Sequence, residues 1–62
     1  MDYRKMIRDK RIAMGLSQNE LAKKVGIAQA FMHEIESGKK NPSVDVLIRI
    51  CEVLEIPLFP EE

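Results

Sequence analysis

The chain contains few side chains that could carry out covalent or metal chemistry: one histidine, His33, and one cysteine, Cys51. A zinc site needs three or four protein ligands, and a nucleophilic site needs a base within hydrogen-bond reach and a third group that orients it. Neither residue has a second ligand at such a spacing, and the sequence has no glycine-rich phosphate loop. The sequence therefore predicts no metal, no cofactor and no enzymatic activity.

The charged side chains, which could bind an anionic partner, are distributed unevenly. Residues 1–40 carry nine Lys or Arg and five Asp or Glu, which gives a net charge of +4. Residues 41–62 carry one Arg and five Asp or Glu, which gives a net charge of −4. This pattern predicts a basic face and an acidic end on a chain whose total charge is zero. A basic face suits nucleic acid, although two ordinary solvated surfaces would give the same pattern.

The sequence also indicates the cellular compartment in which the protein is expected. One cysteine cannot form an intramolecular disulfide, and no segment has the pattern of a secretory signal. No apolar run approaches the roughly 20 residues that span a bilayer. We therefore expect a cytoplasmic protein that is not inserted in a membrane.

Glycine and proline divide the chain into four helical segments. Gly15, Gly26 and Gly38 each follow a periodic stretch, as a C-terminal cap would, and Asn41-Pro42 marks the last break. The expected helices span about residues 2–14, 18–25, 28–36 and 44–54. Ser17 to Glu20 fits the S-x-x-E capping box before the second helix, and Ser43 caps the fourth. No stretch alternates with period two, so the sequence predicts one all-α domain over residues 1–62.

Apolar spacing predicts which faces of these helices are buried. The first helix places Tyr3, Ile7 and Met14 on one stripe. The fourth helix carries an inner stripe at helical spacing, namely Val44, Leu47, Ile48, Cys51 and Leu54. A second apolar stripe of this helix, together with two residues near the C-terminus, either forms a dimer surface or completes the core. The residues of this set are Val46, Ile50, Val53, Leu58 and Phe59.

Residues 18–37 have the spacing of a helix-turn-helix. Two helices that cross steeply need a small side chain where their backbones approach, which Ala22 supplies, and a turn residue that tolerates positive φ, which Gly26 supplies. Ile27, Met32 and Ile35 would then hold the second helix against the others. The outer side of that helix is free to enter a groove about 12 Å wide.

Three blocks over about residues 7–56 carry a resemblance to a known family: residues 15–18 (GLSQ), 20–22 (ELA) and 35–43 (IESGKKNPS). In order, spacing and residue type the chain resembles the phage Cro/repressor (XRE-type) helix-turn-helix DNA-binding family. The resemblance implies a compact, lambda-repressor-like fold of four to five helices. It also implies a sequence-specific transcriptional regulator that binds double-stranded DNA as a homodimer, with residues 28–36 in the major groove.

Individual roles follow from the same resemblance. It implies base contacts by four residues of the third helix: Gln29, Ala30, His33 and Glu34. It implies phosphate contacts by Gln18 at the start of the second helix and by three residues of the following loop: Lys39, Lys40 and Asn41. Gln18 could instead be a plain helix start, and the lysines could be merely solvated. Arg11 and Glu36 match a structural salt bridge between the first and third helices.

Some residues depart from the family pattern or favour another function. Ala28 stands where many relatives carry a capping Ser or Thr, and Glu34 would be repelled by phosphates unless it accepts from a cytosine amine. Phe31 could pack on the second helix, touch DNA or lie in a protein interface. With the zero net charge, Glu34 and Phe31 support an alternative function, a protein-interaction module of the antitoxin-like or regulator-binding kind.

Overall fold

The structure, a computed structural model, describes residues 3–57. Four helices follow one another in this range: α1 (Tyr3–Ala13), α2 (Gln18–Val25), α3 (Gln29–Ser37) and α4 (Val44–Leu54). No strand occurs among the described residues, which confirms the predicted all-α class for this part of the chain.

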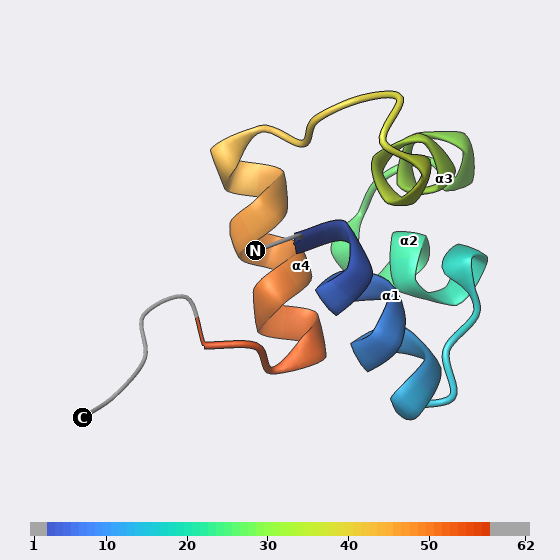
Figure 1. The fold of residues 1–62 in the computed structure, drawn as a ribbon, viewed down its shortest axis with the longest axis vertical. Helices are drawn as coiled ribbons and strands as arrows, with labels where there is room; N and C mark the ends of the chain where they lie inside the picture. Colours follow the sequence, from blue (N-terminus) through green and yellow to red (C-terminus); the bar gives the residue numbers. More distant parts are fainter. Residues whose placement is uncertain (1–2, 58–62) are drawn as a thin grey trace.

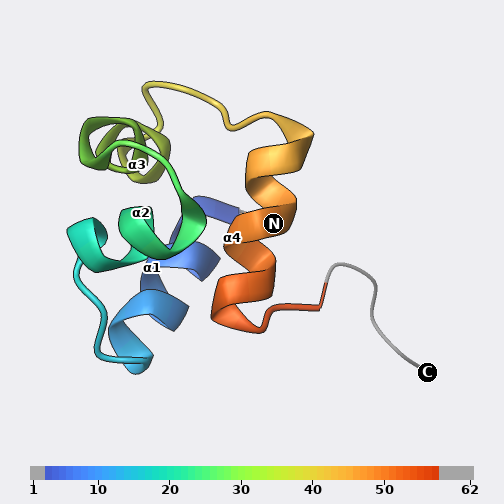
Figure 2. The ribbon, with the colours of Figure 1, turned by 180° about the vertical axis from the view of Figure 1, so that it is seen from behind.

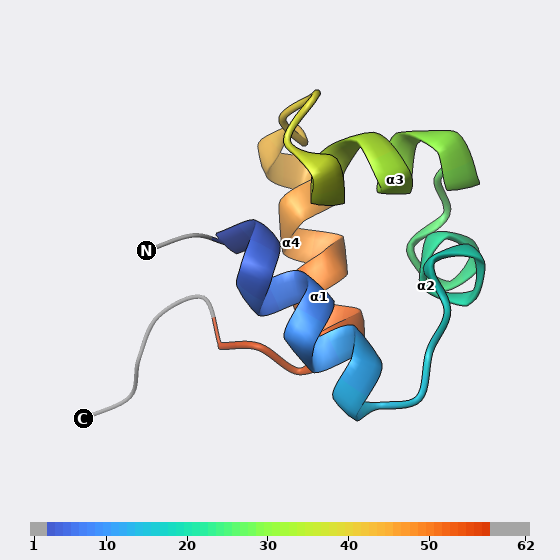
Figure 3. The ribbon, with the colours of Figure 1, turned by 45° about the vertical axis from the view of Figure 1, so that its right-hand side comes forward.

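The helices are arranged around a shared apolar centre. Figures 1 and 2 show α2 and α3 together on one side of α4, and α1 packs against both α3 and α4. Figure 3 shows α3 running sideways from near the upper end of α4, above α1 and α2. The core is built from all four helices and consists of Ile7, Leu21, Ala22, Val25, Met32, Ile35, Val46, Ile50 and Leu54. Every buried residue between positions 3 and 57 is apolar or cysteine, so burial of these side chains is the main stabilising force.

Local sequence signals set most of the helix ends. Ser17 accepts a hydrogen bond from the Glu20 amide, and the Glu20 carboxylate accepts one from the Ser17 amide, which completes the predicted capping box of α2. Ser43 accepts from the Val46 amide at the start of α4, as predicted. The helices therefore begin within a residue or two of their expected positions, and Asp2, the expected start of the first helix, lies outside the described residues.

The predicted inner stripes of α1 and α4 were partly wrong. Val44 is 73% exposed and Met14 is exposed as well, whereas Val46 and Ile50 are buried in the core. Val46 and Ile50 therefore cannot form the dimer surface that the second stripe offered, and they complete the core instead. Val53 is half-buried and packs against this core, while Leu58 and Phe59 lie outside the described residues.

The reason for this error lies in the composition of α4. Apolar residues occur on nearly every side of this helix, so helical spacing alone did not identify which side faces inward. Packing against α1 and α2 decided the question.

Candidate nucleic-acid interface

A tight turn sets the position of α3 relative to α2. Gly26 ends α2 in the left-handed conformation (φ 88°), and its amide donates to the Ala22 carbonyl at 2.8 Å. A β-carbon at Gly26 would meet nothing closer than an Arg49 nitrogen at 3.6 Å, so it is the positive φ that requires glycine here. Ala22 is buried, which allows the two helices to cross closely.

Arg49 supports the same turn from α4. Its Nη1 donates at 3.3 Å to the carbonyl of Val25, the last residue of α2. A cation at a helix C-terminus satisfies free carbonyls and complements the helix dipole. Nothing in the sequence spacing of Arg49 indicates this contact.

The N-terminus of α3 is open to solvent. Ala28 has the extended backbone of an N-cap residue (φ −67°, ψ 146°), but no side chain accepts a hydrogen bond from the first amides of the helix. Gln29 and Ala30 are exposed on this first turn. Met32 and Ile35 are fully buried on the opposite side and hold the helix in place. The first turn of α3 can therefore offer unpaired N–H groups and two exposed side chains to a partner.

Phe31 is half-buried and packs against the core, which corresponds to the packing role among its three predicted alternatives.

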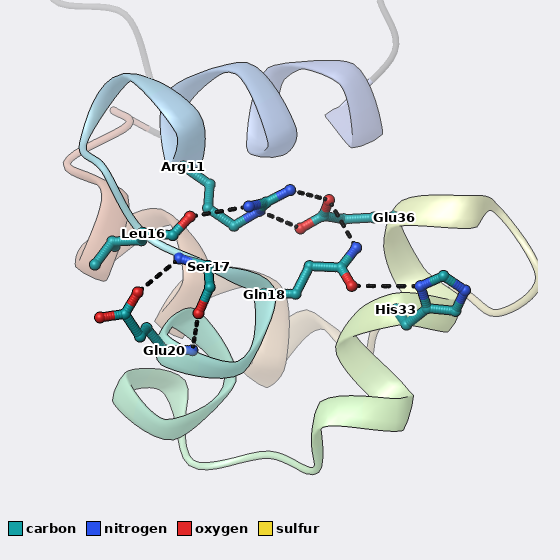
Figure 4. Close-up of polar contacts among 7 residues, drawn as sticks. All are labelled: Arg11, Leu16, Ser17, Gln18, Glu20, His33 and Glu36. Atoms are coloured by element: carbon teal, nitrogen blue, oxygen red, sulfur yellow. Dashed lines mark hydrogen bonds and ion pairs between the residues drawn. The ribbon is translucent and has the colours of Figure 1, made fainter.

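A chain of polar contacts joins α1, α2 and α3 (Figure 4). Arg11 donates to both carboxylate oxygens of Glu36, from Nε at 2.9 Å and from Nη2 at 3.0 Å, and its Nη1 donates to the Leu16 carbonyl at 2.9 Å. The side chains of Arg11 and Glu36 are only 12% and 4% exposed. A bidentate, poorly solvated pair of this kind is stronger than a surface ion pair.

Gln18 extends this chain from α2 to His33. Its Nε2 donates to Glu36 Oε1 at 3.2 Å, and its Oε1 lies 3.3 Å from His33 Nδ1. The side chain that was predicted to contact phosphate is therefore also a link between α2 and α3. His33 is turned toward Gln18, which its position on the outer side of the helix did not indicate.

The loop after α3 carries the predicted lysine pair. Lys39 and Lys40 are exposed, and Lys40 Nζ lies 3.6 Å from the Glu34 carboxylate. Asn41 Oδ1 accepts a hydrogen bond from the Tyr3 hydroxyl at 3.0 Å, which ties the loop to α1. The charge of Glu34, which is unfavourable next to phosphate, is thus partly balanced by Lys40.

Among the carboxyl groups of residues 3–57, Glu20 is the one whose pKa is clearly shifted. The backbone N–H and the hydroxyl of Ser17 hydrogen-bond it and hold its pKa below the ordinary value of 4.5. The capping box therefore keeps a negative charge at the N-terminus of α2, where the helix dipole favours it.

The remaining reactive group lies elsewhere. Cys51 is buried in α4, and this burial raises the pKa of its thiol. Among residues 3–57, no three His, Cys, Asp or Glu side chains are placed to hold a metal ion. No helix in the same range is both long and apolar enough to cross a bilayer.

Comparison with known proteins agrees with this geometry. Residues 7–59 match the family model described as helix-turn-helix (HTH_3). The chain belongs to this helix-turn-helix family, and the resemblance to Cro/repressor (XRE-type) domains is confirmed.

Three relatives illustrate the range of the family. The chain is 42% identical over 50 residues to an uncharacterized HTH-type transcriptional regulator of Archaeoglobus fulgidus, and this match covers 81% of the chain and 71% of the relative. It is 36% identical over 53 residues to the ImmF control region 10 kDa protein of Bacillus phage phi105, and 32% identical over 53 residues to the transcriptional regulator ClgR of Mycobacterium tuberculosis. Each of these two matches covers 86% of the chain, but only 59% of the phage protein and 47% of ClgR, so the chain corresponds to a part of each.

Proposed function

We propose that the protein is a sequence-specific DNA-binding transcription regulator that places α3 in the major groove. The observation that carries the proposal is the open, exposed first turn of α3. The helix is held from behind by buried Met32 and Ile35 and, in its last turn, by the Arg11–Glu36 pair. A rigid helix with a solvent-facing N-terminus is what major-groove recognition by a helix-turn-helix requires.

Base contacts are assigned to the exposed side of α3. Gln29 suits a bidentate pair with adenine N6 and N7, and Ala30 suits a thymine methyl group. Glu34 suits a cytosine N4 amine, which would replace its interaction with Lys40. The ring of His33, on the same helix, contacts Gln18.

Phosphate contacts are assigned around this helix. Lys39, Lys40 and Asn41 follow α3, and the Gln18 amide lies at the start of α2. Contacts of this type position a protein on the duplex and make its affinity depend on salt. We further propose a cytoplasmic homodimer on two half-sites about 34 Å apart, since one such domain buries little surface on DNA.

Selection from a random oligonucleotide pool, followed by mobility shift at two salt concentrations, tests the proposal. We expect one sequence to be enriched and its affinity to fall steeply with salt. Gln29→Ala should cost about 1–3 kcal/mol and relax the preference at one base position. Lys39→Gln should weaken binding to all sequences and reduce the salt slope by about one.

Lys5→Gln is the matched control, because Lys5 is equally cationic and exposed but pairs with Asp9 on α1. No enrichment and no shift at low salt would reject the proposal. That result would favour the protein-interaction module, for which the paired Glu34 and the zero net charge are the supporting features.

A further inference from the structure

A polar hollow of about 200 Å³ lies where α1, α2 and α3 meet. Its lining comes from all three helices and consists of Arg8, Gln18, His33, Glu36 and Ser37. A single water needs only about 10–15 Å³ of free space, so the hollow has room for a larger polar group.

The charges around this hollow favour an anion. Both Glu36 oxygens accept from Arg11, and one also accepts from Gln18, so this carboxylate is neutralised by its own partners. Arg8 is exposed, and within residues 3–57 it makes no hydrogen bond or ion pair. It lies three residues before Arg11 and therefore on the same side of α1. The positive charges of Arg8 and Arg11 and the negative charge of Glu36 add up to a net charge of +1 around the hollow when His33 is neutral.

The contacts of Gln18 determine how His33 presents its ring. A carboxylate in an ion pair can only accept, so the Gln18 amide must turn its nitrogen to Glu36 and its oxygen to His33. His33 Nδ1 must then carry the proton and donate. Figure 4 shows the second ring nitrogen, Nε2, on the side of the ring away from Gln18. The neutral ring thus presents an acceptor at Nε2, and the imidazolium presents a donor.

We propose that this hollow binds one phosphate of the DNA backbone through Arg8 and through His33 in its imidazolium form, so that DNA binding takes up a proton. The inference rests on the proposed DNA-binding function, and it makes His33 a phosphate-contacting residue instead of a base-contacting one. A phosphate oxygen can only accept, so it repels the Nε2 lone pair of the neutral ring and binds the N–H of the charged ring. The Gln18 contact persists in both states because Nδ1 donates in both.

The direction of the pH dependence follows from these charges. Histidine changes charge between about pH 5 and 8, and His33 is the single histidine of the chain. In the free protein the charged groups of the hollow are Arg8 on α1 and Glu36 on α3, which is already paired with Arg11, and α2 contributes the neutral Gln18. A bound phosphate adds a negative charge beside the ring. DNA therefore binds the protonated protein more tightly, and its affinity falls as pH rises through this range.

The test measures binding of a fluorescently labelled duplex, selected from a random pool by the unaltered protein, by anisotropy at pH 5.5 and pH 8.0. Ionic strength is held constant in phosphate-free buffer. We expect about tenfold tighter binding at pH 5.5, as for one hydrogen bond to a charged group. His33→Gln keeps a polar side chain without the charge, and its affinity should change less than about twofold between the two pH values. Arg8→Gln should weaken binding at both pH values, whereas Lys5→Gln should behave like the unaltered protein.

The variants also separate the two levels of the proposal. A thermal melt of each variant checks that it is folded, which we expect because His33 and Arg8 are exposed. Equal pH dependence in the unaltered protein and in His33→Gln would overturn the inference while leaving DNA binding intact. A changed base preference in a pool selected with His33→Gln would overturn it as well, because it would show base contact by His33. Absence of binding by the unaltered protein at both pH values would overturn both proposals.

Discussion

The N-termini of α2 and α3, which are consecutive helices of one motif, are built in opposite ways. At α2, Ser17 and Glu20 satisfy each other's amides in a full capping box. At α3, Ala28 occupies the same position with the same extended backbone but offers no side-chain acceptor. Capping side chains stabilise a helix by about 1 kcal/mol, so α3 lacks a contribution that α2 has.

The difference shows how stability and binding are distributed over the motif. In α2 the Glu20 amide is satisfied by the Ser17 side chain, and this helix serves as support. The first amides of α3 remain available to a partner, and α3 is held in place by Met32, Ile35 and Glu36 further along. The open end of α3 thus depends on strong attachment of the rest of the helix.

The largest effect should come from cutting that attachment. Glu36→Ala leaves Arg11 poorly solvated and without its carboxylate, and Gln18 also loses an acceptor. Removing one partner of a buried pair costs about 3 kcal/mol. We expect this loss in the free energy of unfolding, measured by urea denaturation. The exposed pair Lys5–Asp9 is the control, since Asp9→Ala should cost less than about 0.5 kcal/mol. An unchanged melting temperature for Glu36→Ala would show that α3 is held by apolar packing alone.

A smaller effect should follow from removing the cap of α2. Ser17→Ala deletes the acceptor of the Glu20 amide, at 3.0 Å, and should lower stability by about 1 kcal/mol. Thermal unfolding followed by circular dichroism measures the change. A loss below about 0.3 kcal/mol would mean that water replaces the hydroxyl, and the contrast between the two helix ends would then disappear.

Adding a cap to α3 should act in the opposite direction. Ala28 already has N-cap geometry, so Ala28→Ser should raise stability by about 0.5 kcal/mol, near the lower limit for a cap. The same unfolding experiment detects it. No gain, with the serine folded in the same conformation by NMR, would indicate that the α3 amides are already satisfied by solvent.

The smallest effect should be the contribution of Glu20 to the loss of stability at low pH. Because the folded-state pKa of Glu20 is lowered, its ionised form stabilises the fold above the ordinary value of 4.5, and this contribution is lost as pH falls through the folded value. Glu20→Gln keeps an amide oxygen for the capping box but cannot titrate. The variant should therefore lose less stability than the unaltered protein when thermal melts at pH 6 and pH 3 are compared. Equal losses would remove Glu20 from the acid response.

Prediction from sequence succeeded where a signal is local. The capping residues Ser17 and Ser43 marked helix starts, and Gly26 and Gly38 marked helix ends, because a cap acts within a few residues of its own position. Prediction was wrong for Val44, and for Val46 and Ile50 it left a dimer surface and the core as alternatives, because α4 is apolar on most sides and only its neighbours distinguish these sides. The three-residue spacing of Arg8 to Arg11 is a local signal that both lie on the same side of α1.

The sequence by itself determined the helices, the turn between α2 and α3 and the family, since these depend on residue types at short spacings. Only the tertiary structure decided which face of α4 is buried and how Gln18 and His33 meet, 15 residues apart in the chain. Such contacts depend on how helices pack, because a side chain's partner is selected by distance in space. The open end of α3 depends on both the local sequence and the tertiary structure. Ala28 leaves the helix uncapped, and the packing of all four helices holds it in position.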